Sequence, residues 1–204
     1  VFLAYADALQ PPFRNYSTGE WNMSDEVKSP EGVNLVPFVA QDKFNYSKSL
    51  YDADNNSVRR FVEDWAAVYD DCMAWSYGTF FHDYLCFYDS FGFYSEYYKL
   101  LKENKYMYTF AQIHDCQRGA DTGFGVLHNY LCSKLAWNSD LDVNKLVDDY
   151  FKAMYKDAWV EMKELFTQES LWFAIENART SLTTSSSVTS TEKDKLPFGT
   201  VNDF

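Results

Sequence analysis

Several features that would point directly to a function are scarce in this sequence. No apolar run is long enough to cross a membrane, so no membrane span is expected, and no signal-peptide pattern is present. Only 18 Lys and Arg stand against 30 Asp and Glu, which gives a net charge of −12. Since this charge repels a phosphate backbone and no basic stripe is present, nucleic acid is excluded as a partner.

Metal ligands and reactive side chains are equally sparse. The three His and four Cys show no paired-cysteine or zinc-like spacing, so neither a metal site nor another cofactor is expected. Cys72 and Cys132 fall on apolar patterns and are predicted to be buried thiols. The glycine-containing segment 119–125 lacks the Lys and the spacing of a phosphate-binding loop. The sequence therefore gives no evidence for a nucleophilic cysteine or for a phosphate-binding site.

Aromatic residues, in contrast, are abundant, at 19% of the chain. One interpretation is that they fill the core. The other is that some of them line a groove for flat apolar ligand faces such as sugar rings.

Four short apolar runs recur along the first part of the chain. They are Val1–Ala6, Val33–Ala40, Cys72–Phe80 and Tyr106–Ile113. Amphipathic helical patterns follow at least three of them, and apolar strands alternating with helices are typical of a parallel sheet buried on both faces. The sequence thus predicts the α/β class, with about four parallel strands forming the C-terminal half of a TIM-type (β/α)8 barrel. Half a barrel has open strand edges, so the N-terminal half of the same barrel is expected as a partner.

The remaining chain is predicted to be mostly helical. Helices are expected over about 58–69, 93–103, 126–137, 143–154 and 157–178. The stretch 7–32 is irregular and shows no clear helix. We divide the chain into a half-barrel over 1–156, a trailing helix over 157–179 and a Ser/Thr-rich linker and tail over 180–204.

Three segments resemble a known family. They are Trp75–Leu85 (WSYGTFFHDYL), Tyr108–Gln112 (YTFAQ) and the helical stretch Leu127–Phe151 with its Trp137-Asn138 junction. They resemble a domain-of-unknown-function family of large bacterial proteins that is related to α-glucuronidase-like and hexosaminidase-like glycoside hydrolases. The resemblance spans roughly residues 1–165. It implies the later half of a glycoside-hydrolase-like barrel, a carbohydrate ligand, and an extracellular or cell-surface location.

Catalysis in such a barrel needs carboxylic acids at the C-terminal ends of the strands. Those positions carry aspartates, of which the weak catalytic candidates are Asp7, Asp83 and Asp115, whereas Asp42 and Asp121 are interpreted as ordinary loop residues. Relatives often have an acid at the positions of Ser76 and Ala111, and both positions are expected to point into the barrel mouth. The alternative to an enzyme is therefore a catalytically inactive carbohydrate-binding or scaffold module.

Ligand binding is supported better than catalysis. Near the strand ends lie Tyr5, Trp75, Tyr77 and Gln112, and His82 follows in a loop at the expected rim. Aromatic rings stack on the C–H faces of sugars, while hydroxyl and amide groups hydrogen-bond to sugar hydroxyls. The competing interpretation is that Trp75 and Tyr77, which share a face of their strand, simply fill the barrel interior.

Overall fold

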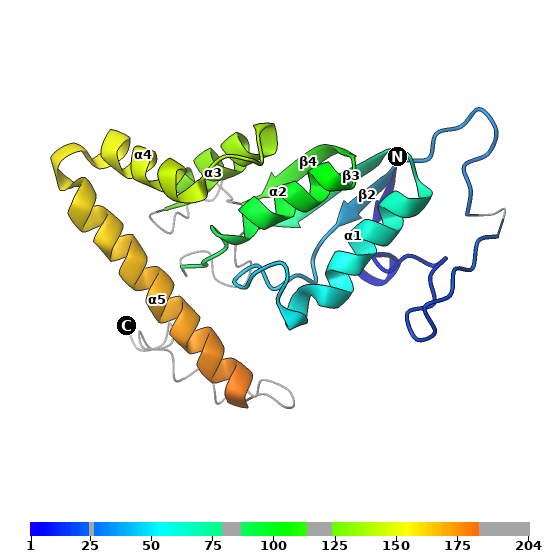
Figure 1. Cartoon of the computed structure of the whole chain (residues 1–204), viewed down its shortest axis with the longest axis horizontal. Coiled ribbons are helices and arrows are strands. Elements are labelled where there is room, and N and C mark those ends of the chain that lie inside the picture. Colours follow the sequence, from blue (N-terminus) through cyan, green and yellow to red (C-terminus); the bar gives the residue numbers. More distant parts are fainter. Residues whose placement is uncertain (25–26, 79–86, 114–123, 184–204) are drawn as a thin grey trace.

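A single parallel sheet organises the molecule. The computed structural model describes residues 1–24, 27–78, 87–113 and 124–183, and side chains up to residue 175 (Figure 1). The strands are β1 (Phe2–Ala4), β2 (Pro37–Ala40), β3 (Cys72–Tyr77) and β4 (Tyr106–Gln112). They pair in the order β1-β2-β3-β4, and every pair is parallel. Each predicted apolar run contains one strand, so the α/β class and the four-stranded parallel sheet are confirmed.

The two faces of the sheet are covered differently. Helices α1 (Asn56–Val68) and α2 (Phe93–Glu103) lie across one face (Figure 1). Along β3 the buried residues Cys72, Ala74 and Ser76 alternate with Met73, Trp75 and Tyr77, which are only partly buried. Side chains of a strand alternate between faces, so the second set lies on the opposite, more open face. Leu3, Tyr5, Tyr108 and Phe110, between 40% and 51% exposed, belong to that open face.

The long connection between β1 and β2 takes the place of a helix. Its described part contains only a short 3-10 turn, η1 (Ala6–Ala8), and no α-helix. Leu9 and Phe13 are nevertheless fully buried, because they pack on α1. There the indole Nε1 of Trp65 donates to the carbonyl oxygen of Leu9 at 2.8 Å, and the ring of Phe13 meets that of Trp65 edge-on at 5.2 Å. The prediction that the stretch 7–32 is irregular is therefore confirmed for its described residues.

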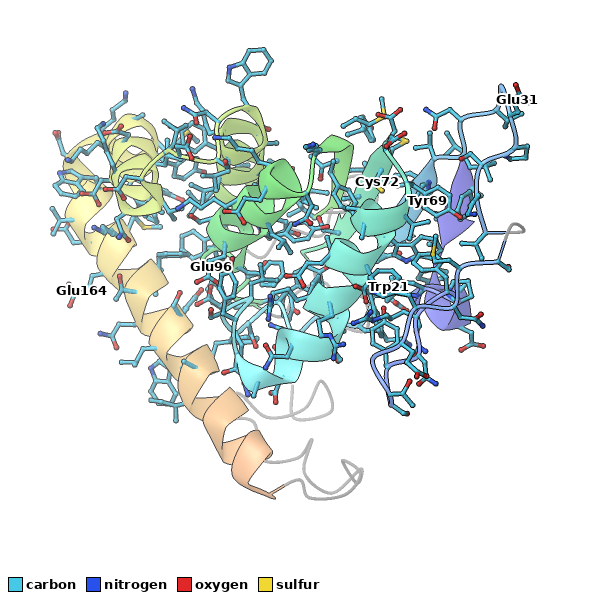
Figure 2. The ribbon with its side chains drawn as sticks, turned by 45° about the vertical axis from the view of Figure 1, so that its right-hand side comes forward. Trp21, Glu31, Tyr69, Cys72, Glu96 and Glu164 are labelled. Carbon is cyan, nitrogen blue, oxygen red and sulfur yellow. The ribbon has the colours of Figure 1, made fainter. Side chains whose placement is uncertain are left out.

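The next connection, between β2 and α1, is held by a buried polar network. Asn55 is fully buried at the end of the 3-10 turn η2 (Ala53–Asn55) and its amide nitrogen donates to the carbonyl oxygens of Asn45 and Ser49. From α2, the carboxylate of Glu96 accepts from Ser49 Oγ at 2.8 Å and Leu50 N at 2.7 Å, and Figure 2 shows it at the lower end of that helix. The loop that follows β2 is thereby fixed to both helices.

Three further α-helices follow β4. They are α3 (Gly125–Trp137), α4 (Val143–Tyr155) and α5 (Trp159–Thr183), with the 3-10 turn η4 (Lys156–Ala158) before α5. The carboxylate of Asp142 caps α4 by accepting from the backbone of Asn144 and Lys145. Phe166 of α5 packs on the rings of Phe91, Phe124 and Phe151, at 5.0–5.6 Å, which attaches α5 to the core. The predicted helices are confirmed, and none in the described ranges is long and apolar enough to cross a membrane.

Candidate functional site

The ends of the four parallel strands meet along one edge of the sheet. Pairing continues just beyond the strands, since Gln41 N donates to Trp75 O at 2.8 Å and Gly78 N donates to Gln112 O at 3.0 Å. Tyr46 adds a side-chain link, because its hydroxyl donates to Gln41 O at 2.6 Å and accepts from Tyr77 N at 3.0 Å. The ends of β2, β3 and β4 therefore form a rigid rim.

Trp75 is the centre of an aromatic cluster on the open face at this rim. Its ring is stacked on Tyr77 at 5.9 Å and meets Phe110 edge-on at 5.1 Å, while Phe38 lies 5.6 Å away. Its indole Nε1 donates to Gln112 Oε1 at 3.1 Å. Ring contacts on three sides and a hydrogen bond at its polar edge fix the orientation of the indole.

Tyr5 extends this cluster toward β1. Burial, followed by the hydroxyl of Tyr5 and the carboxylate of Asp42, raises the pKa of Tyr77 to about 12. Tyr77 thus keeps its proton at neutral pH and can donate a hydrogen bond. The structure brings Tyr5, Trp75, Tyr77 and Gln112 together, whereas His82 lies outside the described residues.

The proposed acids are only partly visible at this rim. Asp7 is exposed within η1, and Asp42 lies 3.6 Å from the ammonium of Lys43. Asp83, Asp115 and Asp121 lie outside the described residues. The catalytic assignments to Asp7, Asp83 and Asp115 therefore stay predictions.

The expectation that Ser76 and Ala111 point into the mouth is wrong. These residues pair with each other, and Ser76 is fully buried on the helix-covered face. The physical reason is strand alternation: Trp75, Tyr77, Phe110 and Gln112 take the open face, so the residues between them must face the helices. The lack of an acid at these two positions consequently carries no argument against catalysis.

Gln41 is a candidate that the sequence analysis missed. It is fully buried directly after β2, and neither its Oε1 nor its Nε2 has a hydrogen-bond partner in the structure, as far as the described residues show. An unpaired buried amide is costly and is typical of a position that a ligand or another segment completes. Its place at the end of a predicted strand was the signal that could have revealed it.

A buried polar cluster supports the rim from the helix side. Ser90 Oγ lies 3.3 Å from the carbonyl oxygen of Gly78 and 3.1 Å from His128 Nε2. The imidazole of His128 packs against the rings of Phe91, at 4.8 Å, and Tyr94, at 5.2 Å. Complete burial lowers the pKa of His128 to about 3, so this side chain is neutral. We interpret the cluster as structural support for the end of β3.

The predicted buried thiols are confirmed, since Cys72 and Cys132 are 1% and 4% exposed. Burial raises the pKa of the Cys72 thiol to about 12, which makes it a poor nucleophile at neutral pH. Within the described ranges, no three His, Cys, Asp or Glu side chains gather as metal ligands would.

Fold and rim together define an α/β protein with an aromatic cluster at the C-terminal ends of a parallel sheet. Residues 22–165 match the family described as a domain of unknown function (DUF4838). Since this match covers more than half of the chain, the protein belongs to that family, and the resemblance to a domain-of-unknown-function family is confirmed. No curated protein and no solved structure matches the chain.

Proposed function

We propose that this chain is part of a carbohydrate-active, glycoside-hydrolase-like protein that binds an oligosaccharide at the C-terminal ends of its strands. The observation that carries the proposal is the oriented indole of Trp75, held by Tyr77, Phe110 and the Gln112 amide on an open sheet face. A fixed aromatic ring beside hydroxyl and amide groups is the combination that suits a sugar ring.

The same proposal includes the architecture. The four strands are the C-terminal half of a (β/α)8 barrel, and the N-terminal half of the same barrel supplies the remaining strands. Two features support this: the open face is rich in apolar side chains, and β1 and β4 are the outer strands of the sheet within the part of the chain that the structure describes. Parallel sheets are normally covered on both faces, so a further partner for the open face is expected. The resemblance adds an extracellular or cell-surface location.

Two modes of action fit the rim, hydrolysis and binding alone. Glycoside hydrolysis commonly uses two carboxylic acids. Among the described residues, Asp42 is the carboxylate whose charge acts on the aromatic cluster, through Tyr77. The catalytically inactive carbohydrate-binding or scaffold module is the second candidate, and the acids Asp83 and Asp115, which would decide between the two, lie outside the described residues. Release of the aryl group from a panel of aryl glycosides distinguishes the two.

Replacing Trp75 by alanine is expected to weaken oligosaccharide binding about tenfold, because a stacked aromatic ring contributes about 0.5–1.5 kcal/mol beyond the area that it buries and about 1.4 kcal/mol is a factor of ten. Trp75→Phe keeps a ring but loses the hydrogen bond to Gln112. Its affinity for the oligosaccharide should therefore lie between those of the wild type and Trp75→Ala. The measurement is isothermal titration calorimetry with neutral and uronic-acid-bearing oligosaccharides. Trp172→Ala, on α5 and 48% exposed, is the matched control. Equal losses for Trp75→Ala and Trp172→Ala would contradict the proposed site.

A further inference from the structure

Polar side chains form a row across the open face just beyond the ring of Trp75. In the sheet Ala40 is opposite Trp75, and Tyr77 is opposite Gln112. Side chains two residues apart along a strand share a face. Asp42, two residues after Ala40, therefore comes to the level of Tyr77. A carboxylate, a hydroxyl and an amide thus follow one another at the ends of β2, β3 and β4.

Two observations support this placement of Asp42. Gln41, which precedes it, is fully buried and still pairs with Trp75 through its backbone, whereas the side chain of Asp42 is 20% exposed. In addition, burial and the hydroxyl of Tyr5 are the main causes of the raised pKa of Tyr77, and the charge of Asp42 adds to them. The carboxylate of Asp42 therefore lies near the hydroxyl groups of the rim.

Two members of the row have hydrogen-bonding capacity left for a ligand. Oδ1 of Asp42 is buried and has no hydrogen-bond partner among the described residues. The ammonium of Lys43 lies 3.6 Å from Oδ2, which is beyond hydrogen-bond distance, and the side chain of Lys43 is 57% exposed. Oε1 of Gln112 already accepts from the indole of Trp75, so its Nε2 is the group that remains to donate. An acceptor and a donor are thus available beside the stacking ring.

A carboxylate in this place distinguishes between classes of sugar. A sugar hydroxyl that donates to a charged acceptor makes one of the stronger hydrogen bonds. The carboxylate of a uronic acid has no proton to donate at neutral pH, and at close range it is repelled by Asp42. The row therefore favours an uncharged sugar that offers hydroxyl groups to Asp42 while its ring stacks on Trp75.

We propose that Asp42 is the specificity-determining residue of this rim, where it accepts hydrogen bonds from the hydroxyl groups of a neutral sugar and excludes uronic acids. The inference rests on the proposed function, because it names the class of sugar that would stack on Trp75. It gives Asp42 a role that the sequence alone did not indicate.

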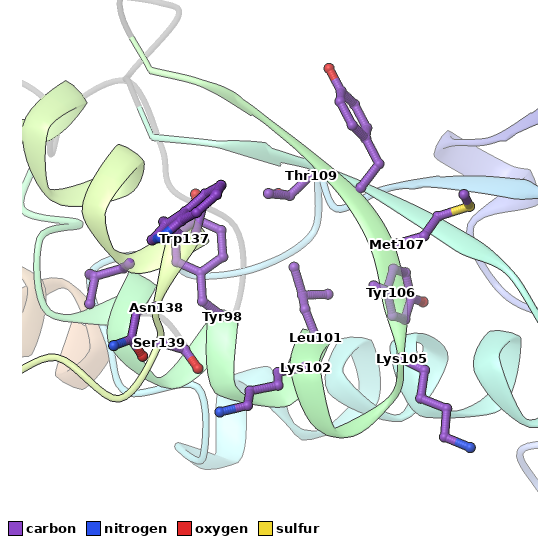
Figure 3. A pocket seen from close by; sticks show the side chains of 13 residues that line it. Tyr98, Leu101, Lys102, Lys105, Tyr106, Met107, Thr109, Trp137, Asn138 and Ser139 are labelled. Carbon is purple, nitrogen blue, oxygen red and sulfur yellow. The ribbon is translucent and has the colours of Figure 1, made fainter.

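A second place suited to an anionic sugar lies at the other end of the sheet. A pocket of about 420 Å³ lies between the beginning of β4 and the ends of α2 and α3 (Figure 3). Lys102 and Lys105 line it. Lys102 is paired with Asp140 at 2.7 Å, whereas Lys105 has no ion pair within the part of the chain that the structure describes. Binding is therefore measured also in the background of Lys105→Gln, so that the affinities refer to the rim.

Matched pairs of sugars test the inference. Isothermal titration calorimetry at neutral pH compares neutral tetrasaccharides of the gluco, manno and galacto series with their uronic-acid counterparts, which carry carboxylates in place of hydroxymethyl groups. The wild type should bind the preferred neutral sugar about tenfold more tightly than its acidic counterpart, and Asp42→Asn should abolish this ratio. Asp70→Asn is the matched control, since Asp70 is exposed before β3, at the opposite end of the strand, and it should leave the ratio unchanged. Circular dichroism verifies that the variants are folded.

The outcomes separate the inference from the proposed function. Uronic acids bound at least as tightly as neutral sugars, in the wild type and in Lys105→Gln alike, would overturn the inference and leave the proposed function standing. A neutral preference that Asp42→Asn does not change overturns it as well, because the discrimination then arises elsewhere. Binding of no sugar by the wild type ends the proposed function and the inference with it.

Discussion

Replacing Gly78 by alanine is expected to lower the free energy of unfolding by about 3 kcal/mol, at the upper end of what overpacking costs. A Cβ atom at this position would lie 2.6 Å from Cε1 of His128 and 2.7 Å from the hydroxyl oxygen of Tyr94. Both side chains are buried and packed among other rings, so neither can move aside easily. Urea denaturation followed by circular dichroism measures the change.

Gly92 provides the control for this substitution. It precedes α2 with φ −72° and ψ −32°, and no atom would lie within 4 Å of an added Cβ. Gly92→Ala should therefore leave the free energy of unfolding unchanged or raise it by up to about 1 kcal/mol, since alanine adopts this backbone conformation and lowers the entropy of the unfolded chain. Similar midpoints for the two variants would show that the space beside Gly78 is not closed.

Acidification from pH 7.5 to pH 5.0 is expected to cost the fold about 2 kcal/mol through His128 alone. In the unfolded chain an imidazole binds a proton near pH 6.5, whereas in the fold burial lowers the pKa of His128 to about 3. Between these two values the unfolded state binds more protons. The contribution of neutral His128 is therefore complete above pH 6.5 and decreases as the pH falls toward 3.

A difference measurement isolates this histidine. The free energy of unfolding is compared between pH 7.5 and 5.0 for the wild type and for His128→Gln. Burial also raises the pKa of Asp89 and Glu169, but these carboxyl groups are common to both proteins and cancel in the comparison. The wild type should lose about 2 kcal/mol more than the variant. An equal loss in both would mean that His128 takes up its proton within the fold.

Apolar periodicity predicted the regular elements well, because burial of one helix face or of a whole strand leaves a clear trace in sequence. The stripe that includes Val58, Val62 and Trp65 became the buried face of α1. The apolar runs became adjacent parallel strands in sequence order. Local hydrophobic patterning is enough for this level of description.

Which face of each strand meets the helices could not be predicted in the same way. In β3 both sets of alternating residues contain apolar members, so periodicity does not distinguish them. The structure places the small residues Ala74 and Ser76 under the helices and the large rings of Trp75 and Tyr77 on the open side. Close approach of helices to a sheet favours small side chains at the contact, and this depends on packing partners far away in sequence.

The burial of residues in irregular segments could not be predicted from the sequence either. Leu9 and Phe13 stand in a stretch without periodicity, yet both are fully buried, and Trp65 binds the backbone there. Gln41 likewise carries no local signal beyond its position after a strand. These residues are buried by contacts with residues far away in the sequence. Local sequence patterns do not predict such contacts.

The sequential order of the sheet has a consequence for how the molecule is made. Among the described strands, β2, β3 and β4 each pair with the strand that precedes them in sequence, so each finds its partner already synthesised. The chain can therefore assemble progressively during translation, with each new strand added to a template that already exists. Among the described strands β4 is synthesised last, so it joins an edge that β1, β2 and β3 have already formed.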